Sequence, residues 1–180
     1  AAGGPASPPV HRLRFSLPAA ARVPECCGGG EGMVHVHVRA PDAAGRAARL
    51  SPYSAHVDLR NRTFDLYVKI YPGGPPDHNG VSGYLGGVAV GEGVHVPEVR
   101  VWDWHRESVR AGLVCFGVGA SECLGSAADL LGAGAEVRMV YASRHAGDRI
   151  LLDEFRALLG GHPGRFRIRH CVSRPDEGSG

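Results

Sequence analysis

Residues 64–71 read Phe-Asp-Leu-Tyr-Val-Lys-Ile-Tyr, and this stretch decides the fold of the first half of the chain. An aliphatic or aromatic side chain occupies every second position from Phe64 to Ile70, which is the period of a strand with one buried face. Similar short segments occupy residues 10–17 and 33–39, with Gly and Pro between them. Several short strands punctuated in this way predict a small antiparallel barrel or sandwich.

In the second half of the chain the apolar residues are spaced differently. Apolar runs at residues 113–118, 137–141 and 166–170 alternate with stretches at 123–131 and 150–159, in which apolar residues recur at helical spacing. The order strand, helix, strand, helix, strand predicts a parallel sheet covered by helices, because such crossovers are right-handed. The fold class expected for the whole chain is therefore α/β, with an antiparallel barrel followed by a truncated parallel domain.

Three parts follow from this division. Residues 1–9 are rich in Gly and Pro and are expected to form a flexible arm. Residues 10–101 would form the barrel, and residues 110–180 the α/β domain. Between the two, Trp102 and Trp104 would lie on one face of an extended segment, where they either close the barrel or anchor a partner.

The composition favours a folded chain and excludes two classes of function. Of the 180 residues, 43% are hydrophobic and 21% charged, enough apolar surface to offset the ordering of the backbone. The formal net charge is only +2 and no run of like charges concentrates it, so a nucleic-acid partner is not expected. No stretch of about 18 apolar residues occurs, so the chain should not span a membrane, although it could lie beside one.

The cysteines and histidines give no strong signal of a disulfide framework or a metal site. The cysteines number five and form no C-x-x-C pair, so reduced thiols are expected, including Cys26 and Cys27 in a Gly-rich loop. His35 and His37 share a strand face without a third ligand nearby, so no metal site is predicted. The Gly, Pro and Ala-rich lead is consistent with the end left by a targeting peptide, so a mitochondrial location is hypothesised, with the cytoplasm as the alternative.

Three motifs in order point to a flavin site. The first reads Leu-Ser-Pro-Tyr-Ser at residues 50–54, the second is the strand at 64–71, and the third reads Asn-Gly-Val-Ser-Gly-Tyr-Leu at 79–85. Together they resemble the flavin-binding barrel of cytochrome b5 reductase and its nitrate reductase relatives, in the ferredoxin reductase superfamily. The resemblance implies FAD as a cofactor, held by Tyr53, Ser54, Lys69, Tyr71, Gly80, Val81 and Ser82.

The chemistry of these motifs suits a dinucleotide, but one position departs from the family pattern. A Tyr ring packs on the flavin, hydroxyls reach its oxygens, and a Gly-Ser helix start presents backbone N–H groups to the pyrophosphate. Where the family has an arginine that pairs with the pyrophosphate, this chain has Ser51. A charge-assisted bidentate contact is thereby lost. Arg49 lies two residues earlier on the same strand face and is the available substitute.

The segment at residues 112–124 resembles the part of the family that binds the nicotinamide dinucleotide. Gly117 and Gly119 match the family's Gly-rich turn, whose small residues let the cofactor approach the backbone. Phe116 replaces a glycine, Val118 a threonine and Glu122 a proline. A ring and a carboxylate at these positions argue against NAD(P)H binding. The alternative interpretation of the segment is a capped helix without a ligand.

Further stretches match the family chiefly as scaffold. Residues 140–155 resemble its segment ending in Asp-Ile-Leu-Leu, and residues 162–175 resemble the strand that ends in Ser-Arg-Pro. The family continues to a Cys-Gly-Pro-Pro segment that has no counterpart here. Neither Cys123 nor Cys171 is therefore assigned to hydride transfer, and no catalytic residue is predicted.

Two functions remain after this comparison. The favoured interpretation is a catalytically degenerate reductase-like protein that serves as a structural subunit, among other protein subunits, of a larger complex, for which a mitochondrial respiratory complex is hypothesised. The lost arginine and the altered Gly turn support it. The alternative is an active FAD-dependent enzyme that passes electrons from NAD(P)H to a haem or similar acceptor, which the motifs at Tyr53 and Gly80 support.

Overall fold

The computed structural model describes residues 8–21, 31–41, 47–71, 80–100 and 108–175. The predictions made for residues 1–7, for Cys26 and Cys27, and for Trp102 and Trp104 lie outside these ranges. The chain divides into two compact units, one holding β1 to β5 with α1, and the other holding β6 to β8 with α2 and α3. Each unit is described by itself.

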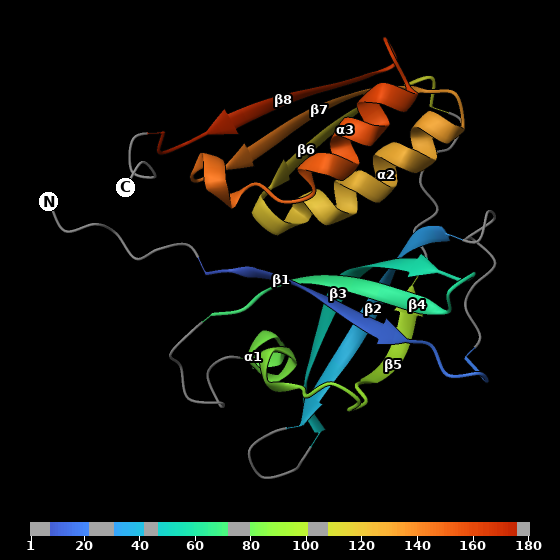
Figure 1. The fold of residues 1–180 in the computed structure, drawn as a ribbon, viewed down its shortest axis with the longest axis vertical. Helices are drawn as coiled ribbons and strands as arrows, with labels where there is room; N and C mark the ends of the chain where they lie inside the picture. Colours follow the sequence, from blue (N-terminus) through green and yellow to red (C-terminus); the bar gives the residue numbers. More distant parts are fainter. Residues whose placement is uncertain (1–7, 22–30, 42–46, 72–79, 101–107, 176–180) are drawn as a thin grey trace, which may run out of the picture. The chain divides into compact units, whose positions relative to one another are not determined.

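The first unit is a five-stranded antiparallel sheet in the order β1-β4-β3-β2-β5 (Figure 1). Neighbouring strands pair in antiparallel register throughout, for example Val36 opposite Tyr53 and Leu13 opposite Leu66. The alternation of the sequence produces this sheet, since each strand has one apolar face to bury. Its elements are β1 (Val10–Ser16), β2 (Glu31–Pro41), β3 (Ala47–Asp58), β4 (Thr63–Lys69), α1 (Gly80–Gly87) and β5 (His95–Arg100).

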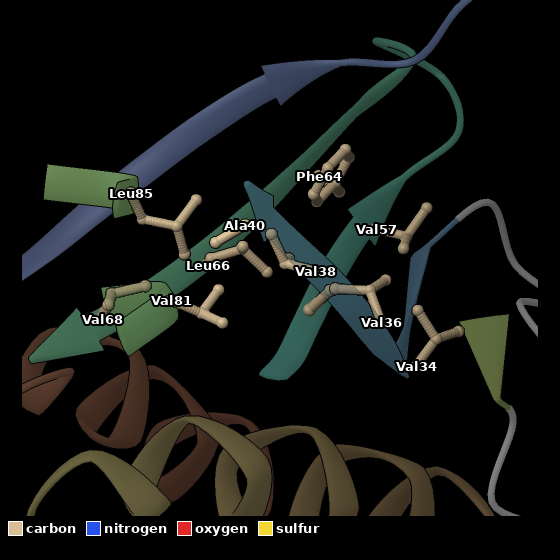
Figure 2. Close-up of a cluster of buried hydrophobic side chains, with 11 residues drawn as sticks. Val34, Val36, Val38, Ala40, Val57, Phe64, Leu66, Val68, Val81 and Leu85 are labelled. Atoms are coloured by element: carbon tan, nitrogen blue, oxygen red, sulfur yellow. The ribbon is translucent and has the colours of Figure 1, made fainter. Parts of the chain in front are cut away.

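The core of this unit lies between the sheet and α1, and Figure 2 shows its side chains. β2, β3 and β4 contribute the residues at every second position, and α1 adds Val81 and Leu85 from one side of its helix. Leu66 and Val38 are completely buried. Burying a side chain of this size stabilises a fold by about 1.5–3 kcal/mol, so this cluster is the main support for the position of α1.

A buried carboxylate joins β1 to β4 on the other face of the sheet. Asp65 is 3% exposed, and both Arg12 and Arg14 of β1 donate to it. The Arg12 Nη2 to Asp65 Oδ2 distance is 2.5 Å, and the Arg14 Nε to Asp65 Oδ1 distance is 2.8 Å. Burial alone would raise the pKa of Asp65, but the hydrogen bonds from Arg14 and Arg12 outweigh it and hold this pKa below its ordinary value.

The second unit is a three-stranded parallel sheet with two helices on one of its faces (Figure 1). Apolar residues on the covered face meet the helices, and Val137, Met139 and Tyr141 of the central strand are almost fully buried. The elements are β6 (Arg110–Phe116), the short 3-10 helix η1 (Gly117–Gly119), α2 (Ala120–Gly132), β7 (Glu136–Ser143), the short 3-10 helix η2 (Ala146–Asp148), α3 (Leu152–Gly161) and β8 (Phe166–Val172).

The opposite face of this sheet is exposed. It carries an apolar group on β6 and β7, in which Phe116 is 72%, Val114 63% and Val140 36% exposed. The same face carries three exposed basic residues, Arg138 on β7 and Arg167 and Arg169 on β8. We call these six residues the open face. It is apolar toward the carboxyl end of β6 and positive along β8, and an ion pair between Arg110 and Glu136 lies at the other end of β6.

The predicted fold class is confirmed: an antiparallel sheet precedes a parallel α/β unit. Some boundaries differ: the strand expected at residues 113–118 ends at Phe116, and the helix expected from residue 150 starts at Leu152. Tyr141 explains the later start of the helix, since its hydroxyl accepts a hydrogen bond from the Ile150 backbone N–H at 2.8 Å. Leu151 then takes a left-handed conformation with φ of 59° before the helix begins.

Candidate functional site

The predicted flavin residues all lie in the first unit, on β3, at the end of β4 and at the start of α1. Tyr53 and Ser54 occupy β3 just before the ladder between β3 and β4 begins at Ala55 opposite Leu66. Lys69 is the last residue of β4, and α1 packs against β2, β3 and β4. The structure therefore brings three segments that are separate in sequence to one region of the sheet.

Strand alternation divides the set between two faces. Tyr53 packs against the core cluster that includes Val81 of α1. Ser54 points to the other face, where its Oγ lies 3.4 Å from His35 Nε2, and Lys69 lies on that face too. Tyr71 follows β4 and is exposed. The ring and the hydroxyl that the resemblance pairs on one flavin are thus next to each other along the strand but not on the same side of it.

The start of α1 has the backbone geometry of an anion cradle. Gly80 has φ of 57°, a conformation that residues with a Cβ rarely adopt, and the helix begins there. Val81 is buried in the core and Ser82 is half-buried, so packing fixes the direction of the first turn. The first N–H groups of a helix have no acceptor within it, and no acidic residue occupies this turn. This helix start suits a phosphate.

At the position where the resemblance implies an arginine, the structure has Ser51. Ser51 lies on β3 opposite Val38 and is half-buried. The Arg49 side chain lies outside the part of the chain that the structure describes. The cradle at Gly80 consequently has its backbone donors but no described guanidinium at the position where the resemblance places one.

Burial raises the pKa of Tyr53 to about 12. The unfolded phenol ionises near pH 10, so above that pH the unfolded chain loses a proton that the folded chain keeps. We expect the free energy of unfolding to fall as the pH rises above about 10, and Tyr53→Phe to remove part of this fall. Urea unfolding at pH 9 and pH 11 measures the effect. Tyr71→Phe is the matched control, and an equal response from both variants would contradict the prediction.

The predicted dinucleotide turn lies in the second unit, between β6 and α2. Gly117 has φ of 53° and Gly119 follows it in η1, so the two matching glycines form a tight turn. Phe116 is the last residue of β6, and its ring stands on the open face, not among the helices. The turn itself is present, but the residue that precedes it presents a large apolar ring to solvent.

The start of α2 is poorly suited to an anion. The Ala120 backbone N–H, at the first position of the helix, already donates to the carbonyls of Gly117 and Val118. Ser121 turns its Oγ inward and donates to the Val118 carbonyl at 2.9 Å. Glu122 places a negative charge in the first turn, where it satisfies the positive end of the helix dipole. A pyrophosphate at this position would find the Ala120 N–H already hydrogen-bonded and would be repelled by the negative charge of Glu122.

Sequence reasoning missed a set of residues at the carboxyl ends of the parallel strands. Ser143 Oγ donates to the His145 carbonyl at 2.8 Å, and the Ser173 N–H donates to the Ser143 carbonyl at 3.0 Å. The Arg174 N–H donates to the Arg144 carbonyl at 2.9 Å, so the loops after β7 and β8 are tied together. Ligands of open α/β sheets bind at this edge, which is the signal that could have identified Arg144 as a candidate.

The two histidines considered as metal ligands have other contacts. The His37 Nδ1 lies 2.9 Å from Glu98 Oε2, and His35 lies beside Ser54. The pKa of Glu98 is lowered, mainly by the hydrogen bond from Arg100. No cluster of three or more His, Cys, Asp or Glu in a metal-binding arrangement occurs within the described ranges. Within the same ranges no helix has the length and hydropathy needed to cross a bilayer.

A cavity of about 920 Å³ opens beside β1 and the segment that leads into β5. Its lining is mainly apolar and includes Phe15, Leu17, Val94 and Val96. None of the predicted flavin residues lines it. The cavity borders the strand that carries Tyr53, because Val36, which lines it, lies opposite Tyr53 in the sheet.

Comparison with known proteins supports the fold. The cytochrome b5 reductase domain of Ulva prolifera nitrate reductase superposes with a TM-score of 0.66 and 24% identity, over 94% of this chain and 70% of that one. The ferredoxin-NADP+ reductase of Plasmodium falciparum gives a TM-score of 0.69 and 14% identity, over 95% and 67%. The CS-b5R domains of human Ncb5or give 0.68 and 19%, over 92% and 48%.

The chain has the ferredoxin reductase fold. No protein-family model matches its sequence, and no curated protein does. At these identities the likeness establishes the fold and leaves the chemistry to the chain's own residues. In this chain the turn glycines Gly80 and Gly117 have different surroundings, which favour an anion at the start of α1 and disfavour one at the start of α2.

Proposed function

We propose that this chain is a ferredoxin reductase-fold protein that does not transfer hydride from a nicotinamide cofactor and acts as an interaction subunit of a larger assembly. The observation that carries the proposal is the turn between β6 and α2. There Phe116 is exposed, the Ala120 N–H is already bonded and Glu122 lies in the first helical turn.

The argument against hydride transfer is electrostatic and steric. A helix N-terminus attracts an anion through its free N–H groups and its dipole, an effect of about 0.3–1 kcal/mol for each exposed charge. Glu122 already satisfies that dipole, and η1 uses the first N–H of α2. A pyrophosphate would therefore lose the contacts that normally hold it on such a turn.

The argument for an interaction role rests on the open face. Val114, Phe116 and Val140 form an exposed apolar group, and a sheet face of this kind is normally covered. The arginines along β7 and β8 give it a positive side, so two copies placed face to face would oppose arginine to arginine. An acidic protein segment with apolar residues matches this face better. We propose such a subunit as the partner.

A second candidate function, a flavin-dependent reductase, is favoured by the start of α1. Gly80 and the first turn of α1 form a phosphate cradle beside Tyr53, so the residues present fit the pyrophosphate of FAD in part. FAD would supply electron transfer chemistry if bound there. The buried phenol of Tyr53 stays protonated at neutral pH and can donate a hydrogen bond.

Direct binding of the nicotinamide cofactors separates the two functions. The purified full chain is titrated with NADH and with NADPH, and the fluorescence of the cofactor is followed. The proposal predicts no saturation up to about 1 mM for either. A dissociation constant in the micromolar range would support the reductase instead, and a preference for NADPH that Arg144→Ala abolishes would place the 2′-phosphate at the carboxyl edge of the sheet.

A further inference from the structure

Two thiols meet where β6 ends and α2 begins. Cys115 is the last but one residue of β6 and faces the helices, and Cys123 lies in the first turn of α2. Each thiol shifts the pKa of the other, in opposite directions. The tight turn at Gly117 places the two cysteines at the same end of β6, with the Cys123 Sγ beside the Val114 carbonyl oxygen.

Three further observations hold the pair in place. The Cys123 Sγ lies 4.0 Å from the Val114 carbonyl oxygen, above the end of β6. A Cβ at Gly119 would lie 3.7 Å from the Cys115 Cβ, so the turn passes close against that cysteine. On the other side Cys115 pairs with Tyr141, which is fully buried. Packed backbone therefore lies on both sides of Cys115, and the Cys123 thiol lies beside the peptide that precedes Cys115.

We propose that Cys115 and Cys123 are a redox modification site that closes to an intramolecular disulfide. The bridge would link the end of β6 to the first turn of α2 across the Gly turn. This inference does not depend on the proposed function, because it needs only the two thiols and an oxidant.

The two thiols differ in the way such a reaction requires. Cys123 is partly exposed, and the hydrogen bond from Cys115 lowers its pKa, although burial and the charge of Glu122 oppose the shift. The pKa of Cys115 is raised by the same hydrogen bond and by burial, and this residue is 4% exposed. The accessible thiol is thus the more acidic one and would react first, with the buried thiol as the resolving partner.

The proposed oxidant is a small-molecule disulfide such as oxidised glutathione. The Cys123 thiolate attacks one of its sulfurs, the S–S bond breaks, and one small thiol leaves while a mixed disulfide forms on Cys123. The Cys115 thiol then gives its proton to solvent and attacks the Cys123 sulfur, which releases the second small thiol. In sum, two protein thiols are oxidised and one small disulfide is reduced to two thiols.

Peptide mapping of the full chain tests the proposal. The wild-type protein is incubated with oxidised glutathione, remaining thiols are alkylated, and the chain is digested with a protease that cleaves after glutamate. Cleavage after Glu122 separates the two cysteines. We expect one linked pair of peptides, which carries no alkyl group and separates on reduction. Cys171, which is exposed and distant in sequence, is the internal control and should carry a glutathione or an alkyl group.

Variants make the order of events visible. In a Cys26→Ser, Cys27→Ser, Cys171→Ser background, Cys115→Ala should leave Cys123 as a stable mixed disulfide with glutathione. Cys123→Ser should leave Cys115 unmodified in the folded chain. If the wild-type pair stays fully alkylated, or if Cys123 stops at the mixed disulfide while Cys115 remains free, the proposal is wrong.

Discussion

Replacing Asp65 by asparagine is expected to lower the free energy of unfolding of the first unit by about 2 kcal/mol. The carboxylate is buried and accepts hydrogen bonds from Arg12 and Arg14, all of which the amide would weaken or lose. Both guanidinium groups are about half exposed, so water takes over part of their solvation and keeps the loss below that of a fully buried pair. Urea unfolding followed by circular dichroism measures the change.

The matched control is Asp153→Asn on α3. Asp153 pairs with Arg156 at 2.6 Å, but its side chain is 89% exposed, so the expected change is below about 0.5 kcal/mol. Equal effects of the two substitutions would show that burial does not strengthen the Asp65 cluster, and would contradict the account given for the pairing of β1 with β4.

The carboxylate of Asp65 also makes the free energy of unfolding depend on pH. Its folded pKa is lower than its unfolded value near 3.9, so the stabilisation is present in full above about pH 4 and is lost as the pH falls through the folded pKa. The wild type and Asp65→Asn should therefore converge in stability in strong acid.

If the open face is the proposed interface, replacing Phe116 by aspartate should weaken the affinity for the partner subunit at least tenfold. A central aromatic side chain of an interface commonly contributes 2 kcal/mol or more, and the new carboxylate would be buried against an acidic partner. The fold should not suffer, because the ring is 72% exposed. Size-exclusion chromatography of the tagged full chain from its native cells measures the shift toward the free 18.9 kDa position.

Val90→Asp controls for the loss of any exposed hydrophobic residue. Val90 is fully exposed and belongs to the first unit, whereas the open face belongs to the second. The Val90→Asp chain should elute with the wild type. The elution position of Arg138→Glu should instead shift in the same direction as that of Phe116→Asp. A Phe116→Asp chain that remains in the assembly, or a wild type that elutes alone, would contradict an interaction role for the open face.

The sequence predicted the architecture because burial patterns are local. The alternation from Phe64 to Ile70 needs only one buried face, and the strand-helix order after residue 110 allows few topologies. The Asp65 cluster could not be predicted in this way. It depends on the register of β1 with β4, in which Arg14 lies opposite Asp65 at a separation of 51 residues.

The candidate sites were predictable in part. The sequence motifs name Tyr53 and Gly80 as candidates, but the opposite directions of Tyr53 and Ser54 follow only once the strand and its core are known. Likewise, the sequence shows that Phe116 stands where the resemblance implies a glycine. Its exposure, however, depends on which face of the sheet the helices cover. The residues Ser143 and Arg144 needed the parallel pairing of β7 and β8.

We propose that this ferredoxin reductase-fold chain does not accept hydride from a nicotinamide cofactor. The most direct test is the visible absorbance of the purified full chain, supplied with FAD under anaerobic conditions and then with NADH or NADPH. We expect the flavin absorbance to remain unchanged after either addition and to bleach with dithionite. Bleaching by NADH or NADPH at a rate well above that of free FAD would contradict the account.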